Sequence, residues 1–233
     1  MAQQPHHSLQ EILDFCSKRL PALAGSVRPS EAFADDADGQ MAKILRDLNR
    51  AYPEAGPIYW ICRVWQLWLW QPVFIGVWAA SLWRISIDMD GFYHRMGMLF
   101  TESYTLPEQT LIPAAESAAV WQTATYLKHW QQRELVRIRR YGAMSDKLAD
   151  YFLGDAVLQA LATAHRLGLM SREETQRAEQ IWQQALAFRC HGRLLWQEDA
   201  QEFFVAKVSC CQHYRRQDAE YCVGCPKTRA KIC

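Results

Sequence analysis

The 233-residue chain has 50% hydrophobic and 22% charged residues, and its 26 Lys and Arg nearly balance 25 Asp and Glu, for a formal net charge of +1. This composition suits a globular domain with its own core and excludes a disordered chain. A near-neutral charge also argues against a dedicated nucleic-acid-binding protein, which normally carries a clear basic excess. We therefore expect one domain over residues 1–233 and no nucleic-acid partner.

The N-terminal residues lack the features of a secretory signal. Residues 1–5 have no basic n-region, and the first apolar stretch, Ile12–Phe15, ends at once in polar and charged residues. We therefore expect a cytoplasmic protein. In that compartment, clustered cysteines serve as metal ligands or redox groups more often than as structural disulfides.

The first predicted elements follow from short local patterns. Ser8-Leu9-Gln10-Glu11 is a capping box and predicts a helix that runs to about Pro21. Residues 25–39 contain two Gly, one Pro and four acids, and predict a surface loop. Apolar residues at helical spacing from Met41 to Leu48 predict a short amphipathic helix.

The most apolar stretch, Val64–Trp83, contains 20 residues without a formal charge. At about 1.5 Å per residue, such a helix would span a bilayer core of about 30 Å. Gln66, Gln71 and Pro72 lie within it, and its five Trp are spread along it rather than placed at its two ends. We therefore expect two buried helical pieces that break at Pro72, with at most peripheral membrane contact.

The second half of the chain predicts a hairpin followed by helices. Alternating apolar residues from Trp83 and the Asp90-Gly91 turn signal predict a β-hairpin over residues 83–100. Residues 105–192 predict helices throughout, with Ser145 as an N-cap and a second capping box at residues 171–174. Phe203–Val208 predicts a short strand. The expected fold class is α+β: a mainly α-helical domain with a small antiparallel β-sheet and a C-terminal cysteine-box segment.

The C-terminal region contains four cysteines, Cys210, Cys211, Cys222 and Cys225, spaced C-C-x10-C-x2-C; we call Cys210–Cys225 the cysteine box. The C-x2-C half closes a tight turn in which two thiolates can hold one metal ion. Gly224 and Pro226 suit such a turn. Adjacent side chains of a strand point apart, so Cys210 and Cys211 converge on one site only if the chain bends there.

Three kinds of site fit this spacing. A structural zinc site uses four thiolates, although zinc ribbons normally use two C-x2-C knuckles. An iron–sulfur cluster also takes four thiolates, and its larger core accepts ligands from a distorted chain. A redox disulfide between Cys222 and Cys225 is the third, although no thioredoxin-like βαβ pattern precedes it. The residues alone leave all three open.

The cysteine box resembles the C-terminal box of the FhuF-type siderophore ferric reductases. The resemblance covers Cys210-Cys211-Gln212-His213-Tyr214-Arg215 and Cys222-x-x-Cys225, about 16 residues in all. It implies that Cys210, Cys211, Cys222 and Cys225 ligate one 2Fe-2S cluster, within an iron–sulfur segment at residues 203–227. It also implies a one-electron oxidoreductase that reduces Fe(III) in an imported ferric siderophore and releases Fe(II). Its electron donor would be a ferredoxin or an NAD(P)H-dependent ferredoxin reductase.

Two groups of cations are candidates for docking substrate or donor. The C-terminal group favours an acidic donor protein or an anionic chelate, and it comprises Lys207, Arg215, Arg216, Lys227, Arg229 and Lys231. Arg133, Arg137 and Arg140 recur at three- and four-residue spacing and share one helix face, which lines a chelate pocket or faces solvent. We take Arg215, Arg216, Lys227, Arg137 and Arg140 as docking candidates.

The remaining expectations concern oligomeric state, Cys233 and the rival function. We expect a monomer with no catalytic side chain beyond the cluster, and Cys233 as an exposed thiol outside the ligand set. The rival function is an interaction protein stabilised by zinc on the same four cysteines, without redox activity. Such a protein would be colourless, where an iron–sulfur protein is reddish-brown.

Overall fold

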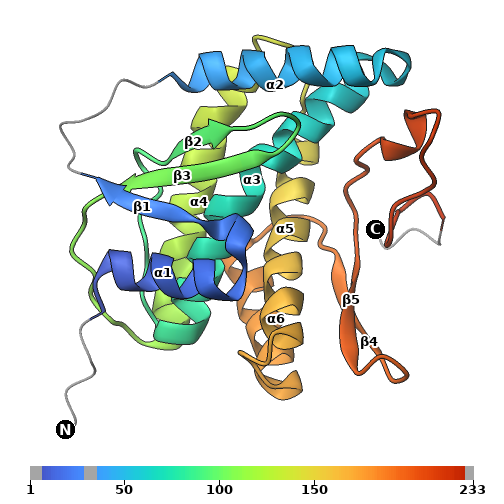
Figure 1. Ribbon diagram of the computed structural model, residues 1–233. Helices are drawn as coiled ribbons and strands as arrows, with labels where there is room; N and C mark the ends of the chain where they lie inside the picture. The colour runs from blue at the N-terminus through green and yellow to red at the C-terminus, as the bar shows by residue number, and fades with distance from the viewer. Residues whose placement is uncertain (1–6, 29–35, 229–233) are drawn as a thin grey trace, which may run out of the picture.

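The computed structural model describes residues 7–28 and 36–228 (Figure 1). The helices in these residues are α1 (Leu9–Arg19), α2 (Ala37–Ala51), α3 (Gly56–Trp83), α4 (Glu116–Ile138), α5 (Asp146–Arg166) and α6 (Arg172–Leu186). The strands are β1 (Gly25–Arg28), β2 (Tyr93–Met96), β3 (Thr101–Pro107), β4 (Arg193–Gln197) and β5 (Glu202–Ala206). The predicted α+β class with a mainly helical body is confirmed.

The core forms around α3, which packs against α5, α4 and α2. Trp65, Trp68 and Trp78 of this helix are fully buried. Two of them also reach polar partners, since Trp78 donates its indole N–H to the Ala160 carbonyl at 2.9 Å and Trp68 donates to Glu134 at 3.0 Å. These three tryptophans are therefore part of the core, and the indole hydrogen bonds of Trp78 and Trp68 connect α3 to α5 and α4. Among the described residues, no helix combines the length and apolar character needed to cross a membrane.

The predicted break at Pro72 is wrong, because α3 continues through Pro72 as one helix of 28 residues. A proline inside a helix removes one backbone hydrogen bond and costs about 3 kcal/mol. Pro72 and its neighbours from Val73 to Ala80 are buried on all sides by other elements. Burial of so much apolar surface outweighs the local cost, and this compensation comes from residues distant in the chain.

The strands form two sheets that lie on opposite sides of the helices in Figure 1. The first sheet has the order β1-β3-β2, with β1 parallel and β2 antiparallel to β3, so it is mixed rather than antiparallel as predicted. β1 also corrects the loop predicted over residues 25–39, because Gly25–Arg28 pairs with Tyr104–Pro107 and α2 already begins at Ala37. The second sheet is the antiparallel pair β4–β5, which packs against α5.

The hairpin lies later in the chain than predicted. Its strands are β2 and β3, joined across residues 97–100, whereas Asp90-Gly91 is a turn that leads into β2. Residues 84–92 bury Ile85, Ile87 and Met89, and this segment makes one isolated bridge, between Ile85 and Pro113. The apolar residues alternate in this segment because one side of an extended connection is buried, and not because the segment pairs as a strand.

The helix starts are predicted best, because capping is local. Ser8 and Ser171 form the expected capping boxes with Glu11 and Glu174, and Ser145 accepts a hydrogen bond from the Leu148 N–H. The helical stretch predicted from residue 105 begins only at Glu116, since residues 105–107 belong to β3.

Among the described residues, one histidine is buried in the core, His94 of β2, which is 1% exposed. Its ring lies 4.3 Å from that of Trp68 and 4.8 Å from that of Phe92. Neither ring nitrogen has a hydrogen-bond partner of normal geometry. Burial lowers the pKa of His94 to about 3, against the opposing effect of the Trp68 carbonyl, which lacks a helical N–H partner because residue 72 is proline. His94 is therefore neutral in the folded protein.

This burial predicts acid sensitivity. The folded pKa of about 3 lies below the ordinary 6.5, so the unfolded state takes up the proton first as the pH falls. Stability is then lost from about pH 6.5 toward pH 3, by about 1.4 kcal/mol per pH unit. In urea unfolding at pH 7.5, 5.5 and 4.5, wild type should lose stability more steeply than His94→Phe. Parallel curves for the two proteins would contradict the assignment.

Candidate functional site

The cysteine box follows β5 and packs beside the N-terminal end of α3 (Figure 1, red segment at the right). The ring of His213 lies 6.2 Å from that of Tyr59, and the Arg216 guanidinium lies 4.0 Å from the centre of the Tyr52 ring. The Gln217 N–H also donates to the Glu54 carboxylate at 3.4 Å. These contacts attach the ten residues between the two cysteine pairs to the helical body.

The two halves of the box meet through their sulfurs. The Sγ atoms of Cys211 and Cys222 are 3.5 Å apart. Two thiolates bound to one tetrahedral ion at bonds of about 2.3 Å lie about 3.8 Å from each other, so this pair has nearly the separation that a shared metal requires. In the described part of the chain, no three or more His, Cys, Asp or Glu side chains already form a group around a metal position. The structure therefore brings Cys211 and Cys222 together, and does not gather Cys210 and Cys225 with them into one group.

The contact between these sulfurs also sets their acidity. A hydrogen bond between the two thiols lowers the pKa of Cys211 and raises that of Cys222, since the pair shares one proton. Burial raises the pKa of Cys210. By contrast, burial raises the pKa values of Cys16 and Cys62 to about 12, which makes these thiols inert. Among the described free cysteines, those outside the box are therefore inert, whereas Cys190 is disulfide-bonded.

The C-x2-C turn in the second half of the cysteine box requires a glycine at position 224, as the sequence predicts. Gly224 has φ +77°, and a Cβ at this position would lie 2.3 Å from the Val205 carbonyl oxygen of β5. The Cys225 N–H donates to the Cys222 carbonyl at 3.0 Å and closes the turn. Gly224 therefore lets the C-x2-C turn pack directly against the strand that leads into the first cysteine pair.

The bend before Cys210 depends on a residue that the sequence reasoning missed. Asp155 of α5 is 4% exposed and accepts hydrogen bonds from the Val208 N–H at 3.1 Å and the Ser209 N–H at 2.8 Å. The Ser209 hydroxyl donates to the same carboxylate at 2.5 Å. Burial raises the pKa of Asp155, and the Ser209 bonds lower it. The sequence contained one signal for this role: Asp155 lies on the apolar face of a predicted helix. Such a position indicates a buried carboxylate with a hydrogen-bond partner, but it does not identify the partner.

The three predicted cations of the box segment differ in their surroundings. Arg215 and Lys227 are exposed, and Lys227 lies 4.5 Å from the centre of the Tyr214 ring. Arg216 is mostly covered, because it stacks on Tyr52 and makes two hydrogen bonds to Asp218, at 3.0 and 2.7 Å. Arg215 and Lys227 are thus available to a partner, whereas Arg216 holds the segment on the body. Arg229, Lys231 and Cys233 lie outside the described residues.

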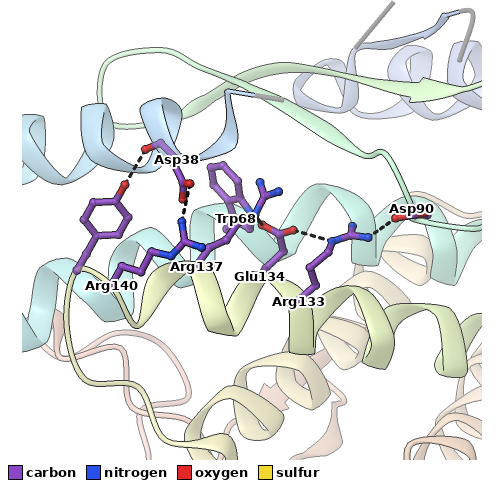
Figure 2. Close-up of polar contacts among 8 residues, drawn as sticks. Asp38, Trp68, Asp90, Arg133, Glu134, Arg137 and Arg140 are labelled. Atoms are coloured by element: carbon purple, nitrogen blue, oxygen red, sulfur yellow. Dashed lines mark hydrogen bonds and ion pairs between the residues drawn. The ribbon is translucent and has the colours of Figure 1, made fainter. Parts of the chain in front are cut away.

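Arg133 and Arg137 lie on α4, whereas Arg140 lies past its C-terminal end at Ile138, so the predicted helix face does not include all three, and they contact different partners (Figure 2). Arg140 pairs with Asp38 of α2 at 2.8 Å. Arg133 and Arg137 flank Glu134 and line a cavity of about 490 Å³. The structure therefore does not bring Arg140 and Arg137 to one cavity.

Comparison with known families identifies the C-terminal segment. Residues 208–227 match the family model of the FhuF 2Fe-2S C-terminal domain. This range contains all four cysteines of the box. No solved structure matches the chain. The segment 208–227 is therefore an FhuF-type 2Fe-2S domain, as the resemblance implied, and its cofactor is a 2Fe-2S cluster.

Proposed function

We propose that this protein is a cytoplasmic, monomeric ferric-siderophore reductase, with Cys210, Cys211, Cys222 and Cys225 as the ligands of its cluster. When bound, the cluster supplies a one-electron couple. The observation that carries the proposal is the 3.5 Å contact between Cys211 and Cys222, within a segment that matches a 2Fe-2S domain. This contact joins the two halves of the box, as a shared ligand set requires.

The reaction follows from the ligand preferences of iron. Hydroxamate, catecholate and carboxylate oxygens are hard ligands that hold Fe(III) strongly and Fe(II) weakly. One electron from a donor protein reduces the chelated Fe(III) to Fe(II), and the donor is oxidised by the same one electron. The chelate then releases the metal more readily, and no proton transfer by a side chain is needed.

The surface of the box suits an acidic electron donor. Arg215 and Lys227 are exposed beside Tyr221 and Val223, which are 54% and 76% exposed. Exposed cations and exposed apolar side chains within one short segment suit a protein whose own redox centre lies among acidic residues. A ferredoxin, or an NAD(P)H-dependent ferredoxin reductase, has this chemistry.

The proposal is tested by colour, metal content and turnover together. The anaerobically purified protein should be reddish-brown, contain about two iron and two sulfide per chain, and lose part of its visible absorption on reduction. The reduced protein should convert a ferric hydroxamate to Fe(II), trapped by a Fe(II)-specific chromogenic chelator. A colourless protein with one zinc per chain would overturn the proposal in favour of the zinc-stabilised interaction protein.

Donor docking gives a separate prediction. Because exposed charges are screened beyond about 8 Å at physiological ionic strength, electron transfer from an acidic ferredoxin should slow as salt rises. The double variant Arg215→Glu/Lys227→Glu should be about tenfold slower than wild type at low salt and should lose the salt dependence. Stopped-flow reduction at several salt concentrations measures both effects.

The matched control reverses one exposed charge far from the box. Arg95 of β2 pairs with Glu102 at 3.4 Å on the first sheet, and Arg95→Glu should keep the wild-type rate and salt dependence. Equal rates for the double variant and wild type would remove the box cations from donor docking.

A further inference from the structure

The two halves of the cysteine box are also placed for a covalent bond between one particular pair of sulfurs. The Sγ atoms of Cys211 and Cys222 lie 3.5 Å apart, in direct contact, and both side chains are partly exposed. A disulfide bond is about 2.05 Å long, so these atoms need to approach by about 1.5 Å. In residues 7–28 and 36–228, neither Cys210 nor Cys225 completes a group of three with this pair. Cys211 and Cys222 are therefore the nearest candidates for a disulfide within the box.

The C-x2-C pair, which the sequence offers as a redox disulfide, is arranged differently. The Cys225 N–H donates to the Cys222 carbonyl at 3.0 Å, and Gly224 lets this turn pack against β5. Cys225 is only 2% exposed, whereas Cys222 is partly exposed and its sulfur contacts Cys211. The turn therefore buries one of its thiols and brings the other to the first cysteine pair.

The contact between Cys211 and Cys222 is supported by neighbours that contain no sulfur. Gln212, with φ +59°, turns the chain directly after Cys211, and its side-chain oxygen accepts the Tyr214 hydroxyl at 2.9 Å. The Tyr214 ring lies 5.5 Å from the ring of Tyr221, the residue before Cys222. This aromatic contact joins the two halves of the box next to the sulfurs. It does not depend on what the sulfurs bind, so we expect it to persist when the cluster is lost.

We infer that, in the cluster-free protein, hydrogen peroxide oxidises Cys211 and Cys222 to a reversible disulfide, and that this bond prevents cluster binding until it is reduced. The inference rests on the proposed ligand set and adds a redox modification to it. A sulfur in a disulfide is no longer a thiolate, and the thiolate is the form that ligates metal. The bond therefore removes two of the four proposed ligands at once.

The oxidation has two balanced steps. A thiolate of the pair attacks one oxygen of hydrogen peroxide, the O–O bond breaks, and a sulfenic acid and one water form. The other thiol of the pair then attacks the sulfenic sulfur, the S–O bond breaks, the S–S bond forms and a second water leaves. In all, two thiols lose two electrons and two protons, and one peroxide becomes two waters. A phosphine or dithiol reductant returns the two electrons and restores the thiols.

Such a bond would act at the point where the proposed reaction is dangerous. The proposed reductase releases Fe(II), and Fe(II) reduces hydrogen peroxide to the hydroxyl radical. A chain that has lost its cluster in peroxide and cannot take up another releases no further Fe(II). Because the disulfide is reversible, the same chain regains its ligands when reductant returns.

The test maps the disulfide in the full chain. The protein is freed of its cluster by a chelator under reductant, desalted and treated with one equivalent of hydrogen peroxide. Remaining thiols are blocked with N-ethylmaleimide, and the disulfides are then reduced with a phosphine and labelled with iodoacetamide. Peptide sequencing by mass spectrometry should find the second label on Cys211 and Cys222 and the first on Cys210 and Cys225. A second label mainly on Cys222 and Cys225, or on Cys210, would overturn the inference.

Neighbouring cysteines provide the matched control variants. Cys210→Ser and Cys225→Ser keep both sulfurs of the pair, so their cluster-free forms should form the disulfide within about twofold of the wild-type rate. Cys211→Ser and Cys222→Ser each remove one sulfur of the pair and should form a box disulfide at least about tenfold more slowly. Equal rates for Cys210→Ser and Cys211→Ser would contradict the pairing. Circular dichroism and melting temperatures establish that each variant is folded, and the mapping of wild type requires no variant.

Cluster assembly tests the consequence of the bond. Oxidised wild type should assemble a cluster from iron and sulfide with an initial rate at least about tenfold below that of the reduced protein. Initial rates are compared because sulfide itself slowly reduces disulfides. Treatment with a phosphine, removed before assembly, should restore the rate. Equal initial rates for a chain shown to carry the Cys211–Cys222 disulfide would overturn the inference.

The outcomes separate this inference from the proposed function. If the holoprotein reduces ferric chelates but its cluster-free form gives no Cys211–Cys222 disulfide, the inference fails and the reductase proposal stands. If the disulfide forms but the reduced chain assembles no cluster and reduces no ferric chelate, the reductase proposal fails and the disulfide assignment stands.

Discussion

Replacing any one of Cys210, Cys211, Cys222 or Cys225 by serine is expected to remove most of the visible absorption and bound iron. A serine oxygen is a poorer match than a thiolate for the iron of this site, and loss of one ligand affects the binding of the whole cluster. Reduction of a ferric chelate should fall more than about tenfold with it, because even changes around metal ligands cost 10- to 100-fold. Absorption spectra, iron and sulfide content and turnover are measured on the same preparations.

The matched control is Cys16→Ala in α1. Cys16 is fully buried, and its pKa is raised to about 12 by that burial, so it takes no part in thiolate chemistry. Its replacement should keep the spectrum and the turnover, at some cost in stability. The decisive positions are Cys210 and Cys211. A holoprotein that keeps its spectrum without one of them would refute the vicinal ligand pair on which the proposal depends.

The parts of the fold that could be predicted depend on local chemistry. The helix starts at Ser8, Ser145 and Ser171 are encoded within four residues, and the structure forms all three caps. The cysteine box is equally local in its second half, where Gly224 has the positive φ that the C-x2-C turn needs. Such features are recognised from sequence because the residues that make them stabilise one another directly.

The parts that could not be predicted depend on distant residues. Pro72 favours a break when α3 is considered alone, yet α4 and α5 bury the helix and keep it continuous. β1 looks like a loop because its partner, β3, follows more than 70 residues later. Arg133, Arg137 and Arg140 have helical spacing in the sequence, but only the fold shows that α4 ends at Ile138 and that Glu134 lies between the first two. Periodicity identifies a helix face and cannot tell what the face contacts.

Replacing Asp155 by alanine is expected to make the cluster labile. Its carboxylate accepts the N–H groups of Val208 and Ser209 and the Ser209 hydroxyl, immediately before the cysteine pair. Asp155→Ala leaves these buried donors without partners, which costs about 1–3 kcal/mol for each donor and frees the chain where it must bend. The cluster should then be lost to a strong iron chelator about tenfold faster than from wild type, as followed by the decay of visible absorption.

The control for this prediction lies on the same helix. Asp150 is bonded to Gln131 at 3.2 Å and has no contact with the box, so Asp150→Ala should keep the wild-type rate of cluster loss. Ser209→Ala removes only the hydroxyl bond and should give a rate between those of wild type and Asp155→Ala. A purely structural role predicts lower melting temperatures with unchanged spectra. A positioning role predicts, in addition, an altered EPR signal of the reduced cluster in Asp155→Ala, because the thiolates of Cys210 and Cys211 change their orientation when the bend before them relaxes. An unaltered signal together with a wild-type rate of cluster loss would show that the bend is fixed by the box itself and not by α5.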